Sequence, residues 1–451
     1  MSRISEGKGI WVLGLPLLIP FLLFGLGMIE TAYFLGAVIF VLYFCLLILN
    51  FEAGFLALIF IRSGLDCLKN FTASGGIIIG AVSIALIVLG VFYVLYSKVN
   101  ILKFEDSGPF LIFLLFCGIS IAYSPDFKES LSDWLRIVSV FSVYILTRII
   151  FVTQKKVLRL FTAILISSLL PVLVAYYQLV TGHGTVLDAG QHRVVGTFFH
   201  PNPFATYLMI LLTFLTAQIL EGTRIVSRGF MVALTGAVFI IFIFTFSRGA
   251  WIAFACSMAV LGLLRYRKIL SFMPVVLLGA FLMIPAIKDR MINIFDAGYT
   301  GGRSGWQWRL ETWSDIGAMV AEKPLLGHGL SAVYAGLGVQ THNDYLRLTA
   351  EVGLLGLLAY LCLSYRVIRQ TWKDYQNVQS DVAKSFQVSL LALAVGLLVR
   401  AFADNTLRDA VVMMYFWIFV AMSRNIAQVY SKQPAALDVN STETEELCVT
   451  N

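Results

Sequence analysis

The stretch His342–Gly356 holds the residues best suited to chemistry, because it lies where a polar segment meets an apolar one. Lys288–Tyr345 contains charges, glycines and aromatic rings, whereas Leu346–Leu363 is almost wholly apolar. A histidine at such a border can reach both a lipid-borne and a water-borne molecule. Because neutral imidazole accepts a proton near neutral pH, we predict that His342 is a general base. The alternative is a histidine at a helix start, beside Asn343, with no chemical duty.

Arginines form the second group of candidate residues. Their planar guanidinium binds the paired oxygens of a diphosphate, and an arginine near a membrane is costly enough to suggest a function. They stand in segments that we expect to face away from the cytoplasm, where arginine is disfavoured. The alternatives are pairing with a nearby acid, such as Glu311, or snorkelling to water. The candidates for diphosphate binding are Arg193, Arg248, Arg309 and Arg303.

The other histidines and acids give weaker signals. The spacing of His183, His192 and His200 matches no common zinc pattern, and no Asp-x-Asp sequence occurs, so we expect neither a metal nor a cofactor. His328 stands between two glycines, which indicates a structural turn. Arg347 is four residues before Glu351, as in a helical ion pair.

Composition places these residues in a membrane protein. Of 451 residues, 59% are hydrophobic and only 13% are charged, with a mean hydropathy of +0.84. Soluble domains carry roughly 25% charged residues. Repeated apolar runs long enough to cross a bilayer predict an all-α polytopic fold. The net charge of +7 reflects basic loops that orient the helices, so we expect no nucleic-acid partner.

The apolar runs predict about 12–14 transmembrane helices. Thr31–Ile61 is ambiguous: it is one long helix, or two helices around a turn at Asn50–Gly54. The later predicted spans are Gly75–Tyr96, Pro109–Ala122, Trp134–Phe151, Val157–Val180, Phe204–Leu220, Gly229–Phe246, Ala250–Leu264, Ile269–Ile287, Leu346–Leu363, Phe386–Val399 and Val411–Ala421.

The spans divide the chain into four parts. Residues 1–287 form N-terminal transmembrane helices, 288–345 form one large periplasmic loop with site residues, 346–430 form C-terminal transmembrane helices, and 431–451 form a disordered cytoplasmic tail. The basic loops at Lys155, Arg265 and Arg366 fall on one side if the spans alternate. The positive-inside rule assigns that side to the cytoplasm, which leaves His342 facing outward.

Several motifs together resemble the bacterial O-antigen ligase and polymerase superfamily. His342-Asn343 is followed, after nine intervening residues, by Gly353-Leu-Leu-Gly356, a pair of glycines typical of close helix packing. Gly196-Thr-Phe-Phe-His-Pro-Asn-Pro resembles the family's segment before a span, and Ser247-Arg-Gly resembles its turn. Arg309-Leu-Glu-Thr-Trp resembles the start of its large loop. The spacing after His342 is the form associated with ligases.

The resemblance implies a GT-C-like, metal-independent, inverting glycosyltransferase of the bacterial inner membrane with a periplasmic active site. Its donor would be a glycan on undecaprenyl diphosphate, and its acceptor a sugar hydroxyl of lipid A–core or of another glycan. Arg248 and Arg309, with Arg193, would hold the diphosphate, and His342 would activate the acceptor. An O-antigen or exopolysaccharide polymerase is the alternative. A transporter of lipid-linked glycan is disfavoured, because we expect the polar groups to gather at one face.

Overall fold

The computed structural model describes residues 49–65, 75–188, 191–223, 225–283 and 305–431, with a few isolated positions beside them. Arg303, most of the first predicted spans and the predicted tail lie outside the described residues. The boundaries of the four predicted parts therefore stay predictions.

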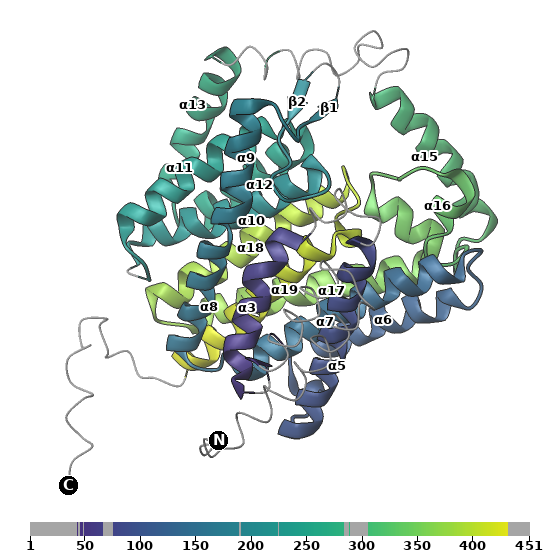
Figure 1. The fold of residues 1–451 in the computed structure, drawn as a ribbon, viewed down its shortest axis with the longest axis horizontal. Coiled ribbons are helices and arrows are strands. Elements are labelled where there is room, and N and C mark those ends of the chain that lie inside the picture. Colours follow the sequence, from purple (N-terminus) through teal and green to yellow (C-terminus); the bar gives the residue numbers. More distant parts are fainter. Residues whose placement is uncertain are drawn as a thin grey trace, which may run out of the picture.

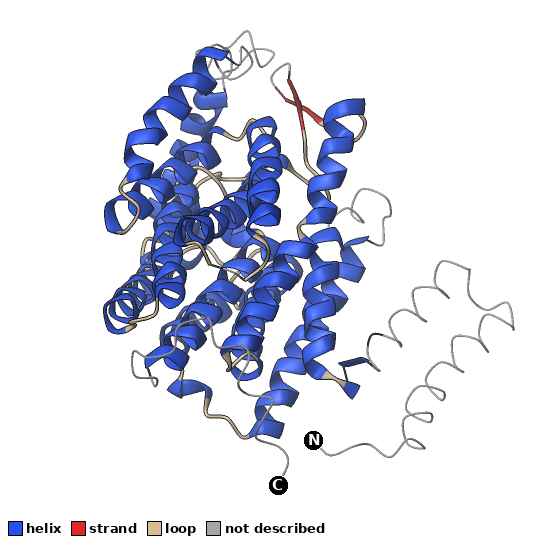
Figure 2. Cartoon of the chain, turned by 90° about the vertical axis from the view of Figure 1, so that its left-hand side faces the viewer, coloured by secondary structure: helices blue, strands red, loops and turns tan. Residues whose placement is uncertain are grey.

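The protein is an all-α polytopic membrane protein, as the composition predicts. Its helices form one bundle, with a short antiparallel hairpin at the upper end in Figures 1 and 2. The elements are α3 Phe51–Leu65, α5 Gly75–Ser97, η1 Ile101–Lys103, α6 Ser107–Ile121, α7 Phe127–Ile150, α8 Gln154–Ser167, α9 Leu169–Thr181, β1 Val186–Asp188, β2 Gln191–Arg193, α10 Pro201–Glu221, α11 Arg228–Phe244, α12 Arg248–Leu264, α13 Lys268–Met283, α15 Gly305–Glu322, α16 Ala332–Leu337, α17 Asp344–Asn377, α18 Asp381–Ala401, η4 Thr406–Arg408 and α19 Ala410–Ser431.

Within the described ranges, six helical segments are long and apolar enough to cross a membrane, and three apolar helices are shorter. The six are Gly80–Ser97, Gln154–Thr181, Pro201–Glu221, Asp344–Asn377, Asp381–Ala401 and Ala410–Ser431. The described part of the predicted polar loop, from Gly305 onward, holds two helices, α15 and α16.

The ambiguous run Thr31–Ile61 is broken at Asn50. The Asn50 side chain accepts a hydrogen bond from the Ala53 N–H, 3.1 Å away, and α3 starts between them at Phe51. A Cβ on Gly54 would lie 2.9 Å from the Leu47 Cα. In one continuous helix these residues would be about two turns apart, so the chain reverses there. The turn at Asn50–Gly54 is therefore present, whereas most of the run before it lies outside the described residues, so the interpretation as two helices stays a prediction.

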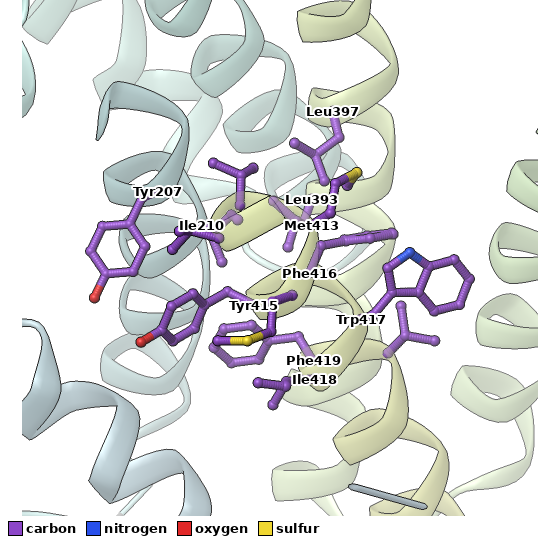
Figure 3. Packing of buried hydrophobic residues seen from close by; sticks show 14 of the residues in the cluster. Tyr207, Ile210, Leu393, Leu397, Met413, Tyr415, Phe416, Trp417, Ile418 and Phe419 are labelled. Atoms are coloured by element: carbon purple, nitrogen blue, oxygen red, sulfur yellow. The ribbon is translucent and has the colours of Figure 1, made fainter. Parts of the chain in front are cut away.

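The centre of the bundle is formed by α10, α18 and α19. Figure 3 shows Tyr207, Leu397 and Trp417 among the side chains that pack there. Phe214 and Phe419 stack with ring centroids 3.8 Å apart. Interiors packed this closely resist rearrangement, so α18 and α19 are a rigid support for the loop that joins them.

Helix α17 is interrupted at Gly353, where φ is 76° and ψ is −179°. The break leaves backbone N–H and carbonyl groups without hydrogen bonds inside the helix, and the preceding loop supplies partners for them. The Leu354 N–H donates to the Pro324 carbonyl at 2.8 Å, and the His328 N–H donates to the Ala350 carbonyl at 2.9 Å. The two glycines predicted close packing against a helix. The close partner of Gly353 is instead the backbone of a loop, which fixes that loop to α17.

We expect Gly353→Ala to lower the thermal unfolding temperature of the detergent-solubilised protein. Its Cβ would lie 2.1 Å from the Leu325 carbonyl oxygen, and the left-handed backbone disfavours any side chain. Together these effects cost at least about 2 kcal/mol. Gly317→Ala on α15 is the control, because its Cβ meets nothing within 4 Å. Equal melting of the two variants would contradict this account.

A buried ionic cluster around Arg424 lies at the end of the bundle opposite His342. The Arg424 side chain, 1% exposed, donates to Asp106 and Asp374 at 2.9 Å each. The Tyr375 hydroxyl, beside Asp374, bonds the carbonyl of Leu264 next to a basic loop. Polar groups therefore occur at both ends, which differs from the expectation of one polar face. The ion pairs of Arg424 tie α19 to α6 and α17.

Candidate active site

His342 lies in the loop between α16 and α17, beside an acidic partner. Its Nδ1 is 3.1 Å from the Oδ1 of Asp404, and its side chain is 21% exposed. When Nδ1 carries a proton, it donates to Asp404 and leaves the Nε2 lone pair free to accept one. His342 also has a φ of 48°, a conformation rare for residues other than glycine. Such strain is typical of functional sites.

Asp404 is held as a carboxylate by its surroundings. It lies in the short loop between α18 and α19, and it pairs with Arg400, which is 1% exposed. Burial opposes ionisation of Asp404, but the Arg400 charge and the His342 hydrogen bond outweigh it and hold the Asp404 pKa well below its usual range. A permanent negative charge therefore faces His342, where it stabilises an imidazolium.

Arg400 connects this pair to the start of α12. Its Nε donates to the Thr206 hydroxyl at 3.0 Å, and a Cβ on Gly249 would lie 2.6 Å from its Nη1. Gly249 follows Arg248, the first residue of α12. The cap residue Ser247 makes no side-chain bond to the helix N–H groups. A helix start with uncapped N–H groups and nearby arginines favours an anion.

Arg193 joins the same region from the hairpin. Its Nε donates to the Thr245 carbonyl at 2.8 Å, and its Nη2 donates to the Asn202 Oδ1 at 2.9 Å. The same Asn202 oxygen accepts from the Ser247 hydroxyl at 3.1 Å. Asn202 therefore links the strand that carries Arg193 to the turn that precedes Arg248.

Helix α15 packs against the loop that carries His342. The ring of Trp308 meets that of His342 at 69°, with centroids 5.8 Å apart. The Trp313 indole N–H donates to the Thr341 carbonyl at 2.8 Å. Arg309 directly follows Trp308 on this helix and is half-buried. These contacts place the α15 segment that carries Arg309 against the loop that carries His342.

The structure thus joins most of the candidates predicted from the sequence. His342 connects through Asp404 and Arg400 to the start of α12 at Arg248. Arg193 connects through Asn202 to the turn before Arg248. Arg309 lies on α15, the helix that contacts His342. Arg303 lies outside the described residues.

Asp404, Arg400 and Asn202 were not identified from the sequence. A charged pair four residues apart at the end of an apolar run, as in Arg400 and Asp404, is the signal that could have revealed two of them.

The remaining histidines form hydrogen bonds with residues that are close to them in the sequence. His183 bonds Thr181, His192 bonds the Thr185 hydroxyl at 2.8 Å, and His328 Nε2 bonds the Met319 carbonyl at 2.8 Å. The ring of His200 caps α10 by accepting from the Asn202 N–H. Across the described ranges, no group of three metal-binding side chains occurs.

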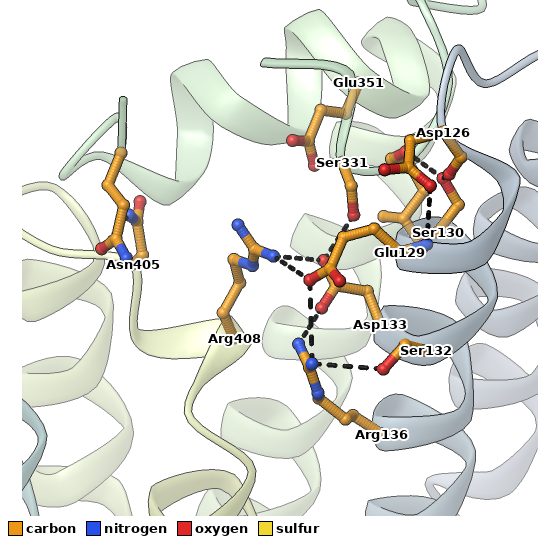
Figure 4. A network of polar contacts seen from close by, with 12 residues as sticks. Asp126, Glu129, Ser130, Ser132, Asp133, Arg136, Ser331, Glu351, Asn405 and Arg408 are labelled. Atoms are coloured by element: carbon orange, nitrogen blue, oxygen red, sulfur yellow. Dashed lines mark hydrogen bonds and ion pairs between the residues drawn. The ribbon is translucent and has the colours of Figure 1, made fainter. Parts of the chain in front are cut away.

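A polar network fixes the loop that holds Asp404. Figure 4 shows Arg408 directed at Asp133 and Glu129 of α7, at 2.8 and 3.2 Å. The Leu407 N–H donates to the Asp344 carboxylate at 2.9 Å. The loop is thus held on α7 and on the first turn of α17, which sets the distance between Asp404 and His342.

Beyond Asp344, the first turns of α17 carry a predicted ion pair. The Arg347 guanidinium donates to the Glu351 carboxylate at 2.9 Å, and both side chains are buried. The four-residue spacing in the sequence predicted this pair correctly. This ion pair lies next to the break at Gly353 and stabilises the first turns of α17, which directly follow His342 in the chain.

Comparison with known families finds a match over part of the chain. Residues 230–361 match the family described as O-Antigen ligase. This match supports the resemblance to the O-antigen ligase superfamily. The matched region contains Arg248, Arg309 and His342, whereas Arg193 and Asp404 lie outside it.

The chain is also similar to three rickettsial proteins, each named "Putative polysaccharide ligase". The Rickettsia conorii protein is 26% identical over 144 residues, which cover 28% of this chain and 35% of the relative. The Rickettsia felis protein is 30% identical over 79 residues, covering 14% and 19%. The Rickettsia typhi protein is 25% identical over 131 residues, covering 25% and 31%. The matches span about a third or less of each relative.

Proposed function

We propose that this protein is a glycosyltransferase of the bacterial inner membrane that transfers a glycan from undecaprenyl diphosphate to a sugar hydroxyl. The acceptor we propose is lipid A–core, which makes the enzyme an O-antigen ligase acting on the periplasmic side. The observation that carries the proposal is the continuous set of contacts from His342 through Asp404 and Arg400 to the start of α12 at Arg248.

The two ends of this set of contacts have different roles in the reaction: His342 acts on the acceptor, and the arginines act on the leaving diphosphate. His342 Nε2 takes the proton of the acceptor hydroxyl, and the acceptor oxygen forms a bond to the anomeric carbon of the donor glycan. The bond from that carbon to the diphosphate breaks, and the diphosphate leaves with the electron pair. Attack opposite the leaving group inverts the anomeric centre. Asp404 stabilises the imidazolium that forms.

The leaving diphosphate gains negative charge, which the arginines stabilise without a metal ion. Arg248 and Arg193 flank the start of α12, whose N–H groups add to the positive potential. Arg309 approaches from α15, and we include Arg303 on the strength of the sequence. Guanidinium groups supply the charge that metal-dependent transferases obtain from a cation.

Gel analysis of the surface glycan after deletion of the gene tests the function. Loss of all glycan from the core, with polymer still on undecaprenyl diphosphate, is expected for a ligase. Single repeats that remain attached to the core would identify a polymerase instead. Accumulation of the lipid-linked glycan on the cytoplasmic side would identify a transporter and overturn the proposal.

We expect Asp404→Asn to lower kcat by about 10- to 100-fold, the loss typical when an outer group that orients a functional histidine is removed. The amide keeps the shape but removes the charge that stabilises the imidazolium, so KM for the donor changes little and the pH–rate profile shifts. Asp381→Asn is the control, because its side chain is 71% exposed and pairs with Arg265 far from His342. An unchanged kcat and pH profile in Asp404→Asn would remove it from the mechanism.

A further inference from the structure

The two loops that carry His342 and Asp404 also hold buried polar atoms that have no hydrogen-bond partner among the described residues. They are the Thr341 hydroxyl, the Asn405 carboxamide oxygen and the Thr406 hydroxyl. Their residues are 1%, 5% and 2% exposed. An unpaired buried polar group is unfavourable, and such groups are rare in native proteins. Their presence beside one histidine–aspartate pair therefore indicates a polar ligand.

Two contacts hold these loops side by side. The Asn405 Nδ2 donates to the Gln340 Oε1 at 3.4 Å, and the His342 Nδ1 lies 3.1 Å from the Asp404 Oδ1. Thr341 stands between Gln340 and His342, so its hydroxyl is adjacent in the chain to both contacts. The contact between Asn405 and Gln340 is longer than a typical hydrogen bond. The loops therefore separate most easily at this contact to admit a small group.

The unpartnered groups are uncharged, which limits the kind of ligand. Thr341 and Thr406 carry hydroxyls that both donate and accept, and the Asn405 oxygen is an acceptor. The nearby carboxylate of Asp404 is already paired with Arg400. A diphosphate would need cations here. The ligand that matches these groups is neutral and carries several hydroxyls, as a sugar does.

The charged side chain of the same loop is directed elsewhere. Figure 4 shows Arg408 directed at Asp133 and Glu129 of α7, whereas Asn405 lies on the opposite side of Arg408 and joins none of these contacts. A charged ligand would find this cation already paired, which again favours an uncharged one.

An exposed aromatic ring stands beside the polar groups. Phe402, two residues before Asp404, is 54% exposed, and its ring packs against that of Trp313 with centroids 5.7 Å apart. The Trp313 indole N–H donates to the Thr341 carbonyl at 2.8 Å, so one side chain joins the ring to Thr341. A sugar has hydroxyls at its edge and C–H groups on its faces. An exposed ring next to polar groups offers a surface for both.

We propose that Thr341, Asn405 and Thr406 form a subsite for the acceptor sugar, with the ring of Phe402 as its apolar wall. This inference rests on the proposed function and names the residues that hold the acceptor next to His342. The reacting hydroxyl lies at His342 Nε2, and its neighbours on the same sugar bond the Asn405 oxygen and the threonine hydroxyls. These bonds select which hydroxyl faces His342, so the subsite sets the linkage.

Thr341→Val tests the subsite, because valine keeps the shape of threonine and removes the hydroxyl. With purified lipid A–core, the acceptor KM is expected to rise about tenfold, the effect of one lost hydrogen bond, while the donor KM keeps its wild-type value. The thermal unfolding temperature should not fall, because the lost hydroxyl has no partner in the free protein. Thr162→Val is the control: its hydroxyl bonds the Leu158 carbonyl within α8, so the unfolding temperature falls and both KM values stay unchanged.

An unchanged acceptor KM in Thr341→Val would overturn the subsite and leave the proposed function intact. Equal rises of the acceptor and donor KM with a lower unfolding temperature would do the same, because they would mean that the hydroxyl only supports the loop. Failure of the wild-type protein to use lipid A–core would overturn the proposed acceptor and the subsite with it.

Variants of Phe402 decide whether its ring faces the sugar or the bilayer. Phe402→Leu keeps an apolar side chain without a ring, so it is expected to raise the acceptor KM about threefold more than Phe402→Trp does. The same acceptor KM in both variants would place the ring in the aromatic belt of the membrane interface and remove it from the subsite.

Discussion

Replacing His342 by alanine is expected to reduce glycan transfer by about 10²–10⁴-fold, the usual contribution of a general base. The loss falls on kcat, because the arginines that hold the donor are unchanged. KM for the donor should therefore stay close to the wild-type value. Initial rates with purified protein in detergent or nanodiscs, at saturating acceptor, measure both constants.

The backbone of His342 calls for a second variant, since its φ of 48° is unfavourable for alanine. Asparagine tolerates this conformation better, so His342→Asn separates loss of the base from loss of loop structure. Both variants should lose activity equally. His183→Ala is the control, because His183 is exposed and bonds only Thr181 within its own turn. Near-normal turnover in His342→Asn would exclude His342 as the base.

The sequence predicted His342 and Arg248 as candidate site residues because their signals are local. Each stands where an apolar run begins, and the loop charges predict the side of the membrane. The partner of His342 could not be found this way. Asp404 is 62 residues further along the chain, and only the packing of α18 and α19 brings it within 3.1 Å. A contact of this range depends on the whole bundle rather than on any local pattern.

The break in α17 was hidden for a related reason. An apolar run that contains Gly353 is compatible with a continuous helix, since glycine costs only about 1 kcal/mol there. The break is stabilised by the loop around Pro324, which supplies the missing hydrogen bonds. The sequence around Pro324 contains no local pattern that indicates this contact. Its role in fixing α17 becomes visible when the two segments are in contact.

Arg248→Lys is expected to lower kcat by about 10²–10³-fold, as seen when a donor to a developing negative charge is lost. Lysine keeps the charge but replaces a planar fork with a point charge, so it cannot bind two diphosphate oxygens in the same geometry. Gly249 adds a steric reason: the absence of its side chain leaves room for Arg400 against the start of α12. The two guanidinium-bearing segments therefore meet at one helix end, where small displacements matter.

The matched control for this variant is Arg228→Lys. Arg228 is also the first residue of an apolar helix, α11, but it is exposed and makes none of the contacts that join the site. A lower kcat with unchanged donor KM in Arg248→Lys would mean that Arg248 acts on the departing diphosphate, whereas a raised KM alone would mean that it binds donor and transition state equally. Wild-type kinetics in Arg248→Lys would show that α12 does not hold the diphosphate, and the proposed division of labour between Arg248 and His342 would fail.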